Sequence, residues 1–258
     1  MPETGIGVLE KPKLPHPTHE IAAYYTGKYN SAEKSDSPEL ARINLIKMAF
    51  PYLLSFRQSD RVLDIGAGKQ ILERQLRNYF KNKAGRPLQI PIVTLDVANI
   101  KYRKLLEKKQ KNIHHVLARS EKLPIPDESI ALVISSMALD LMPDEAIAEV
   151  FRVLKPCSHA LITLHHPALI PNDLEELLKK QNVRASERRV YEIWDYLIKN
   201  QKLSSDMNTI ANRLNKYGFN IATINEARDE KDTWWEIDLI KPEKADENNL
   251  WAQEESNL

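Results

Sequence analysis

The chain has 258 residues, of which 42% are hydrophobic and 28% charged, and its formal net charge is +1. These proportions are typical of a folded globular protein, and the balanced charge favours neither nucleic acid nor a membrane as a partner. The single cysteine, Cys157, excludes an intramolecular disulfide and a zinc site made of several thiolates.

The two ends of the chain differ in composition from its centre. Residues 1–18 contain four prolines and predict an extended arm, whereas residues 242–258 are acidic and predict a flexible tail. The chain has neither the apolar core of a signal peptide at its start nor an apolar run of ~20 residues elsewhere, so we expect a cytoplasmic protein. The remaining residues, 19–241, predict one domain.

Short apolar strands alternate with helices through the first two thirds of this domain. A helix is expected after Ser37-Pro38-Glu39, because proline suits the first helical turn. The expected strands are Arg61–Ile65, Ile90–Leu95, Ile113–Ala118, Ile130–Ser135 and Ala160–Leu164, and the helices between them are Gln70–Lys81, Lys101–Lys109 and Asp144–Leu154. This alternation indicates a parallel sheet with helices on both faces, an α/β fold.

The pattern changes after the fifth expected strand. Residues 172–217 predict a helical insertion, in which Arg184, Arg188 and Arg189 either contact a substrate or form a solvated face. Two further strands, Phe219–Ile224 and Thr233–Ile240, are joined by the polar turn Glu226–Asp232 and predict a hairpin that completes a seven-stranded sheet.

A glycine turn follows the first expected strand, in the run from Val62 to Lys69. Gly66 and Gly68 have no Cβ, so a ligand can approach the backbone closely beside the free N–H groups of the next helix. A dinucleotide fingerprint would need a third glycine at Ile71, and a phosphate-binding loop would need Ser or Thr after Lys69. These differences disfavour hydride transfer and ATP hydrolysis, but a structural turn would also explain the glycines.

An acidic residue, Asp96, ends the second expected strand. Its carboxylate is suited to accept hydrogen bonds from both hydroxyls of a ribose. Alternatively, Asp96 caps a helix that begins near Asn99. The glycine turn one β–α unit earlier favours the ribose interpretation.

Five segments together resemble the class I S-adenosylmethionine (SAM)-dependent methyltransferases, of the small-molecule type related to ubiquinone- and biotin-pathway enzymes. These segments are residues 62–68, Asp96, residues 120–127, residues 135–139 and residues 151–156. The resemblance implies a Rossmann-like sheet with an antiparallel last strand and SAM as the cofactor, with no metal.

The resemblance also implies roles for individual residues. Asp64 with Gly66, Ala67 and Gly68 would hold the amino-acid end of SAM, Asp96 the ribose, and Val97, Ser120 and Glu121 the adenine. Ser135 and Ser136 would lie beside the methyl group. Tyr25, in the pair Tyr24-Tyr25, would either fold over the sulfonium or pack in the core.

Three positions depart from the family pattern. Gln70 stands where a third glycine is common, Arg119 where the adenine loop often has Asp, and Cys157 in place of a turn glycine. These changes leave the fold unaffected but bear on cofactor affinity.

Candidate catalytic residues follow the fourth and fifth strands. His165 and His166 precede Pro167, and neighbouring residues of an extended chain point in opposite directions, so only one of the two would face a pocket. An imidazole there would serve as a general base, or would simply be hydrogen-bonded within the loop. Asp140 is a second candidate, with helix capping as its alternative role.

The sequence therefore predicts an enzyme that transfers a methyl group from SAM to O, N or C of a small molecule. Two alternatives remain open. One is a nucleic-acid or protein methyltransferase that docks through Lys11, Lys13 and Lys101–Lys111. The other is a SAM-binding regulatory protein without catalysis. The oligomeric state is not predicted.

Overall fold

The computed structural model describes residues 22–26, 39–98, 112–170, 172, 174–180, 185–200 and 202–243. The arm expected at residues 1–18, the helix expected at Lys101–Lys109 and residues 244–258 of the expected tail lie outside the described residues.

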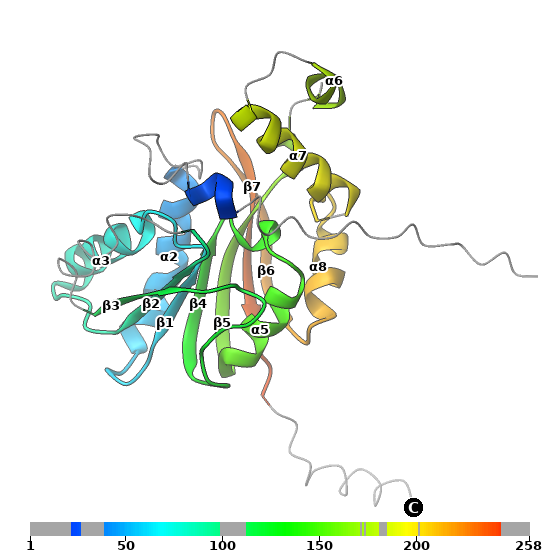
Figure 1. Ribbon diagram of the computed structural model, residues 1–258. Helices are drawn as coiled ribbons and strands as arrows, with labels where there is room; N and C mark the ends of the chain where they lie inside the picture. The colour runs from blue at the N-terminus through cyan, green and yellow to red at the C-terminus, as the bar shows by residue number, and fades with distance from the viewer. Residues whose placement is uncertain are drawn as a thin grey trace, which may run out of the picture.

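A seven-stranded sheet forms the centre of the molecule (Figure 1), in the order β3-β2-β1-β4-β5-β7-β6. The strands are β1 (Val62–Ile65), β2 (Ile92–Asp96), β3 (Ile113–Leu117), β4 (Ile130–Ser136), β5 (Leu154–His165), β6 (Asn220–Arg228) and β7 (Thr233–Ile240). Strands β1 to β5 are parallel, and β7 is antiparallel to both of its neighbours. The expected mostly parallel sheet with an antiparallel last strand is confirmed.

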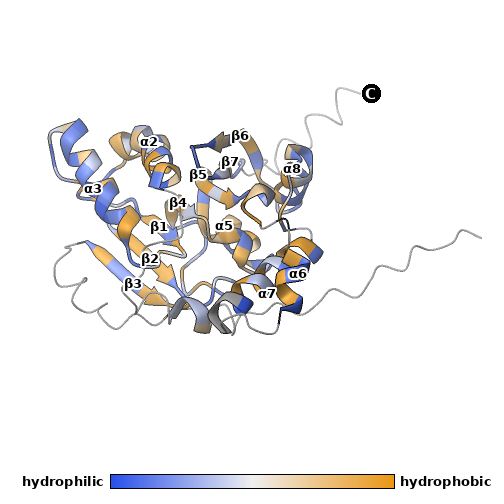
Figure 2. Ribbon diagram, turned by 90° about the horizontal axis from the view of Figure 1, so that it is seen from above, coloured by the Kyte–Doolittle hydropathy of each residue, from blue (hydrophilic) through white to orange (hydrophobic). Residues whose placement is uncertain are grey.

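Helices cover both faces of the sheet. Helices α2 (Glu39–Ser55) and α3 (Ile71–Ala84) lie on one face, opposite α5 (Glu145–Val153), as the view from above shows (Figure 2). Leu72, Leu76 and Phe80 recur at four-residue spacing on α3 and pack into the core beside β1, β2 and β4. On the other face, α5 shares a core cluster with α8 (Met207–Asn215).

Two strand boundaries differ by four residues or more from those expected. Strand β5 begins at Leu154, directly after α5, rather than at Ala160. A bulge makes this possible: Cys157 has φ 58°, and its N–H donates to the carbonyl of Lys241 at 2.9 Å. Strand β6 continues to Arg228, because pairing with β7 overrides the polarity of the segment, and the turn shortens to residues 229–232.

A helical insertion lies between β5 and β6, as expected for residues 172–217. It contains α6 (Leu174–Lys179), α7 (Ala185–Lys199) and α8. Lys202, between α7 and α8, links the insertion to the segment that precedes α5. Its Nζ lies 3.1 Å from Asp144 Oδ1 and donates a hydrogen bond to the carbonyl of Met142. Arg213 of α8 contacts the same Asp144 oxygen at 2.7 Å. The insertion is thus held against the start of α5.

Candidate functional site

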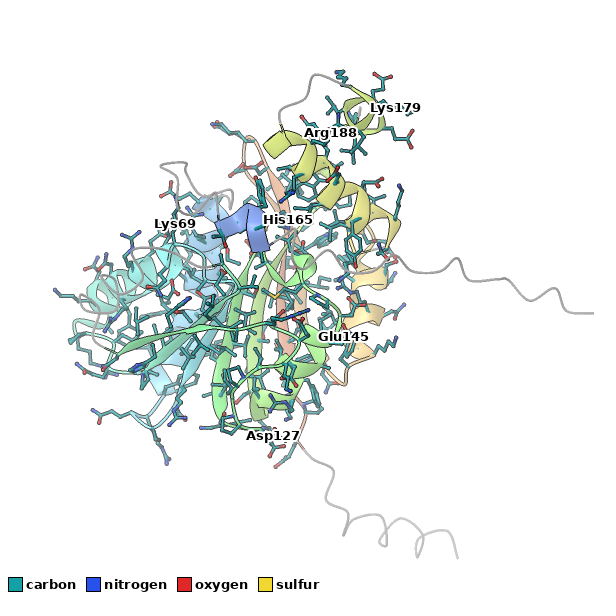
Figure 3. The ribbon with its side chains drawn as sticks, in the orientation of Figure 1. Lys69, Asp127, Glu145, His165, Lys179 and Arg188 are labelled. Atoms are coloured by element: carbon teal, nitrogen blue, oxygen red, sulfur yellow. The ribbon has the colours of Figure 1, made fainter. Side chains whose placement is uncertain are left out.

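A cavity lies at the carboxyl ends of β1, β2, β4 and β5, where ligands usually bind in open α/β sheets. Lys69, from the loop after β1, and His165, at the end of β5, lie toward this edge of the sheet in Figure 3. The cavity is lined by Tyr25, Arg42, Asp64, Gly66, Ala67, Gly68, Lys69, Ile71, Leu72, Leu95, Asp96, Val97, Ala118, Arg119, Ser120, Glu121, Ser136, Met137, Ala138, Leu141, Met142, Pro143 and His165.

The glycine turn after β1 forms the floor of this cavity. Gly66 and Gly68 have φ values of 77° and 49°, which most side chains disfavour. A Cβ added at Gly66 would overlap the Cβ of Ala138 in the loop after β4. Glycine is therefore required at position 66 for packing between two loops, in addition to any role in ligand approach.

Asp96 connects the glycine turn to the end of β2. One carboxylate oxygen accepts the N–H of Gly68 at 2.8 Å, and the other accepts the N–H of Ala98 at 2.7 Å. Burial raises the pKa of Asp96, and these backbone donors oppose the rise. The side chain lines the cavity and accepts a hydrogen bond from the start of the following loop, whereas the helix that it would cap lies outside the described residues.

Gln70 adopts the backbone conformation that a third glycine would supply. Its φ is 55°, and its side chain turns into the protein, where Nε2 donates to Thr94 Oγ1 at 3.0 Å. Thr94 Oγ1 in turn lies 2.8 Å from His115 Nδ1. Gln70 is 2% exposed and does not line the cavity. This departure from the family pattern therefore leaves the cavity floor unobstructed.

The second departure, Arg119, lies at the rim of the cavity. Its guanidinium pairs with Glu121, which lines the same rim. Ser120 and Val97 also line this part of the cavity. The third departure, Cys157, is exposed in the bulge at the start of β5, away from the lining residues.

The two serines that end β4 point in different directions. Ser136 lines the cavity, whereas Ser135 is fully buried and its Oγ donates to the carbonyl of Ile65 at 3.0 Å. Successive side chains of a strand alternate between its two faces, which explains the difference. Ser135 thus joins β4 to β1. It was expected beside the methyl group, but it does not line the cavity.

Asp140 and His165 form a buried pair beside the cavity. Asp140 lies in the short helix η1 (Leu139–Leu141), and its Oδ2 lies 2.8 Å from His165 Nδ1 and accepts the backbone N–H of His165 at 2.8 Å. Burial alone would raise the pKa of Asp140, but the imidazole and these hydrogen bonds lower it below its usual value. In a neutral His165 ring, an ionised Asp140 favours the tautomer with the proton on Nδ1, in which Nε2 is the acceptor.

The two histidines occupy different environments. His165 lines the cavity, and its ring packs edge-to-face on Trp194 of α7 with a centroid distance of 5.1 Å. His166 lies outside the cavity lining: its Nδ1 accepts the N–H of Ala168, and its ring lies 5.5 Å from that of Trp235. Of the two candidate bases, the geometry thus places only His165 where a ligand can reach it.

Aromatic residues close one side of the cavity. Tyr25, in a helix at residues 22–26, lines it and packs with Tyr24 against a cluster that contains Leu141 and Tyr196. Tyr25 therefore both packs and lines the cavity, and its contact with a sulfonium stays a prediction. Arg188 lies on the outer part of the insertion (Figure 3), where it donates to carbonyls at the end of α6 rather than facing the cavity.

Several lining residues were not predicted from the sequence. Arg42 enters from α2, and Met137, Leu141, Met142 and Pro143 come from the segment between β4 and α5. Met137 lies within the segment 135–139 that carries the family resemblance, but no local motif marks Arg42 or residues 141–143, because they meet the cavity only through packing. The one available signal for residues 141–143 was their place after a parallel strand, at the edge where ligands bind.

Other kinds of site are absent from the described part of the chain. Within it, no group of three His, Cys, Asp or Glu side chains is arranged to hold a metal ion. No helix among the same residues is long and apolar enough to cross a bilayer. The basic stretch Lys101–Lys111 lies outside the described residues.

Comparisons with known proteins find matches to the centre of the chain. Residues 63–162 match the family model described as a methyltransferase domain. A malonyl-[acyl-carrier protein] O-methyltransferase from Marinomonas sp. is 32% identical over 113 residues, which cover 43% of this chain and 40% of that protein. An uncharacterized protein from Haemophilus influenzae is 42% identical over 129 residues, 48% of this chain and 49% of that protein. The matched region thus spans less than half of each relative.

Solved structures agree with the fold. The 1,6-didemethyltoxoflavin-N1-methyltransferase of Burkholderia thailandensis, solved with S-adenosylhomocysteine, gives a TM-score of 0.61 at 12% identity, and the match covers 91% of this chain and 94% of that one. Phosphoethanolamine N-methyltransferase 2 of Haemonchus contortus gives a TM-score of 0.56 at 13% identity, over 87% of this chain and 57% of that one. The strand order and these structures confirm the expected Rossmann-like fold, and residues 63–162 are similar to a methyltransferase domain.

Proposed function

We propose that the protein is an enzyme that transfers the methyl group of SAM to an O, N or C atom of a small molecule. The observation that supports this most directly is the composition of the cavity. One end contains the glycine turn and the buried carboxylate of Asp96, and His165, paired with Asp140, lies in the same cavity. A cofactor half and an acceptor half thus share one cavity.

The residues present fit SAM at the cofactor half. Each carboxylate oxygen of Asp96 accepts one backbone N–H and retains a further lone pair for a ribose hydroxyl. The glycine turn allows the amino-acid end to approach the backbone, and one oxygen of the Asp64 carboxylate, Oδ2, has no hydrogen-bond partner. Val97, Ser120 and Glu121 would bound the adenine.

The chemistry required of the protein is mainly positioning. SAM, when bound, supplies a methyl group already activated by the sulfonium, so the chain must align the acceptor atom and exclude water. Asp140 orients the ring of His165 and holds its proton on Nδ1. Nε2 of His165 would then remove a proton from an acceptor such as a phenol, an amine or a carbon acid.

The acceptor half supports a small molecule as substrate. Its wall is mostly apolar, with Met137, Leu141 and Met142, and Tyr25 closes one side. The guanidinium of Arg42 adds one positive charge to this lining. Apolar walls with a few polar groups are typical of small-molecule sites.

The proposal is tested by calorimetry of the full chain with SAM and with S-adenosylhomocysteine (SAH), its demethylated product. This binding measurement is followed by a screen of phenols, amines and carboxylic acids with methyl-labelled SAM. We expect both cofactor forms to bind and labelled methyl to appear in one acceptor class. Absence of binding by both forms at millimolar concentration would refute the proposal, and binding without transfer to any acceptor would favour a regulatory protein.

A further inference from the structure

A buried lysine joins the helical insertion to the wall that residues 141–143 form in the acceptor half of the cavity. Lys202 follows α7 and is 8% exposed. Its Nζ donates to the carbonyl of Met142 and lies 3.1 Å from Asp144 Oδ1. Met142 lines the cavity, whereas Lys202 and Asp144 do not. The ammonium group therefore holds the backbone of this wall from outside the cavity.

Arg213 of α8 completes a cluster around the same carboxylate. Its guanidinium donates to Asp144 Oδ1 at 2.7 Å and to the backbone carbonyl of Lys202 at 3.2 Å. Two cations thus share one carboxylate oxygen, and each of them also donates to a backbone carbonyl. Because burial of an unpaired ammonium group is costly, Lys202 is stable at this position only while it keeps these partners.

The backbone of Lys202 also ends α7. Its N–H donates to the carbonyl of Leu197 at 2.9 Å, which satisfies one of the free carbonyls at the end of the helix. The same helix carries Trp194, whose ring packs edge-to-face on His165. A side chain carried by a helix is placed more precisely than one carried by a loop, so anchoring the end of α7 also fixes where Trp194 meets His165.

The side chain of Met142 extends toward the cofactor half. Its Cε lies 3.2 Å from the position that a Cβ at Gly66 would occupy, so the methyl group packs against the glycine turn. The backbone of Met142 is thus bound by the insertion, and its side chain lies at the boundary between the two halves of the cavity. The glycine turn itself is held by the hydrogen bond between Gly68 and Asp96, which is independent of Lys202.

We propose that Lys202 is a positioning residue for methyl transfer, which acts through the carbonyl of Met142 on the wall of the acceptor half. By ending α7 it also holds Trp194 against His165. This inference rests on the proposed function. Since Lys202 does not line the cavity and the glycine turn has its own support, loss of the ammonium group should disturb the acceptor half and leave cofactor affinity nearly unchanged.

The chain contains reporters for a direct test. Of its five methionines, Met137 and Met142 line the cavity, and Met48 lies on α2. Nuclear magnetic resonance spectra of the full chain with isotope-labelled methionine methyl groups are recorded without ligand, and the resonances are assigned by single Met→Leu substitutions. Lys202→Leu removes the ammonium group. We expect this variant to shift or broaden the Met142 resonance, while Met48 keeps its wild-type resonance and so shows that the variant is folded.

Two further variants separate positioning from a contribution to stability alone. Lys202→Arg keeps the charge and the donors, and it should move the Met142 resonance back toward its wild-type position. Lys199→Leu is the matched control, because it removes an exposed ion pair with Asp195 on the same helix, and it should leave the spectrum unchanged. A contribution to stability alone would lower the Tm of Lys202→Leu without moving the Met142 resonance.

Kinetics with the acceptor found in the screen give a second readout. Lys202→Leu should lower kcat/KM for the acceptor by roughly 10- to 100-fold, because a misplacement of about 1 Å in a positioned group costs this much. The larger part of the loss should lie in KM, since the wall contacts the acceptor before as well as during transfer. Calorimetry should give a Kd for SAH within about threefold of wild type.

The outcomes distinguish this inference from the proposed function. An unchanged Met142 resonance in folded Lys202→Leu would overturn the inference, as would equal changes in Lys202→Leu and Lys199→Leu. Neither result involves cofactor binding, whereas the proposed function fails if neither SAM nor SAH binds. If Lys202→Leu does not fold, Lys202→Gln takes its place: its shorter, neutral side chain cannot make both contacts, and the same change at Met142 is expected.

Discussion

The two halves of the cavity are built in different ways. The cofactor half comes from two consecutive strand ends, where Asp96 is hydrogen-bonded to the backbone of the glycine turn after β1. The acceptor half joins Asp140, His165 and Trp194, which belong to η1, β5 and the helical insertion. One half is specified by local backbone geometry, and the other by the packing of distant segments.

The difference indicates how each half responds to change. The cofactor half depends mainly on backbone N–H groups and left-handed glycines, with the Asp96 carboxylate bonded to them. The acceptor half depends on side chains held by other side chains, such as His165 by Asp140 and Trp194. Variation in substrate is therefore expected to arise in the helical insertion.

The largest expected effect is from His165→Ala, which should lower turnover without weakening cofactor binding. Removal of a general base typically lowers turnover by about 10²–10⁴-fold. The affinity for SAH should remain within about twofold, because neither carboxylate of the cofactor half contacts His165. Turnover of the acceptor found in the screen and calorimetry with SAH measure the two effects. His166→Ala is the matched control and should retain turnover; equal losses in both variants would contradict the assignment.

Asp96→Asn should instead weaken cofactor binding. Loss of a charge-assisted hydrogen bond costs about 1.5–3 kcal/mol, which corresponds to a rise of roughly 10- to 100-fold in the Kd for SAH. Asp127→Asn is the control, because Asp127 lies at the opposite end of the sheet (Figure 3) and its side chain is 73% exposed. An unchanged Kd in Asp96→Asn would remove the ribose role.

Glu73→Gln should stabilise the protein in a manner that depends on pH. Burial on α3 raises the pKa of Glu73 in the folded state, so the folded protein loses stability as pH rises above the ordinary value of a glutamate. The amide does not titrate and escapes this loss. We expect the Tm of the variant to exceed that of the wild type by several degrees at about pH 8 and by little at about pH 4.5. A difference in Tm that is the same at both pH values would be evidence against a buried, protonated Glu73.

The smallest expected effect is from Gln70→Gly, which tests whether the cofactor half is indeed a backbone structure. Glycine accepts the left-handed conformation more readily, but the hydrogen bond to Thr94 is lost. The gain from placing glycine in the left-handed conformation and the loss of the hydrogen bond are each about 1 kcal/mol and oppose one another. SAH affinity should stay within about threefold of wild type by calorimetry. A much larger loss would mean that the buried amide, and not the backbone alone, shapes the cavity floor.

Much of the fold was predictable from the sequence because its strands are continuous apolar runs separated by helices. The glycine turn and Asp96 were predictable for a related reason: both follow a strand directly, and topology brings the ends of parallel strands to one edge. The predicted start of β5 was wrong because the first residues of this strand are polar. Only cross-strand pairing and the bulge at Cys157 make them a strand.

The pairings within the site were less predictable. Asp140 and His165 were named separately, but their contact depends on how η1 packs beside β5. Ser135 was wrongly expected in the cavity, because the alternation of β4 was not applied to it. The buried position of Glu73 was also missed although a signal existed: Glu73 is an acidic residue on the apolar stripe of α3.

The contact between Gly66 and Ala138 has a consequence for engineering. The glycine turn beneath the proposed methyl donor and the segment that carries Asp140 are in direct contact, with no space for a side chain at Gly66. Neither segment can therefore change its conformation independently of the other. In a library selected for a new substrate, tolerated changes should concentrate in the helical insertion rather than in these two turns, and position 138 should accept nothing larger than alanine.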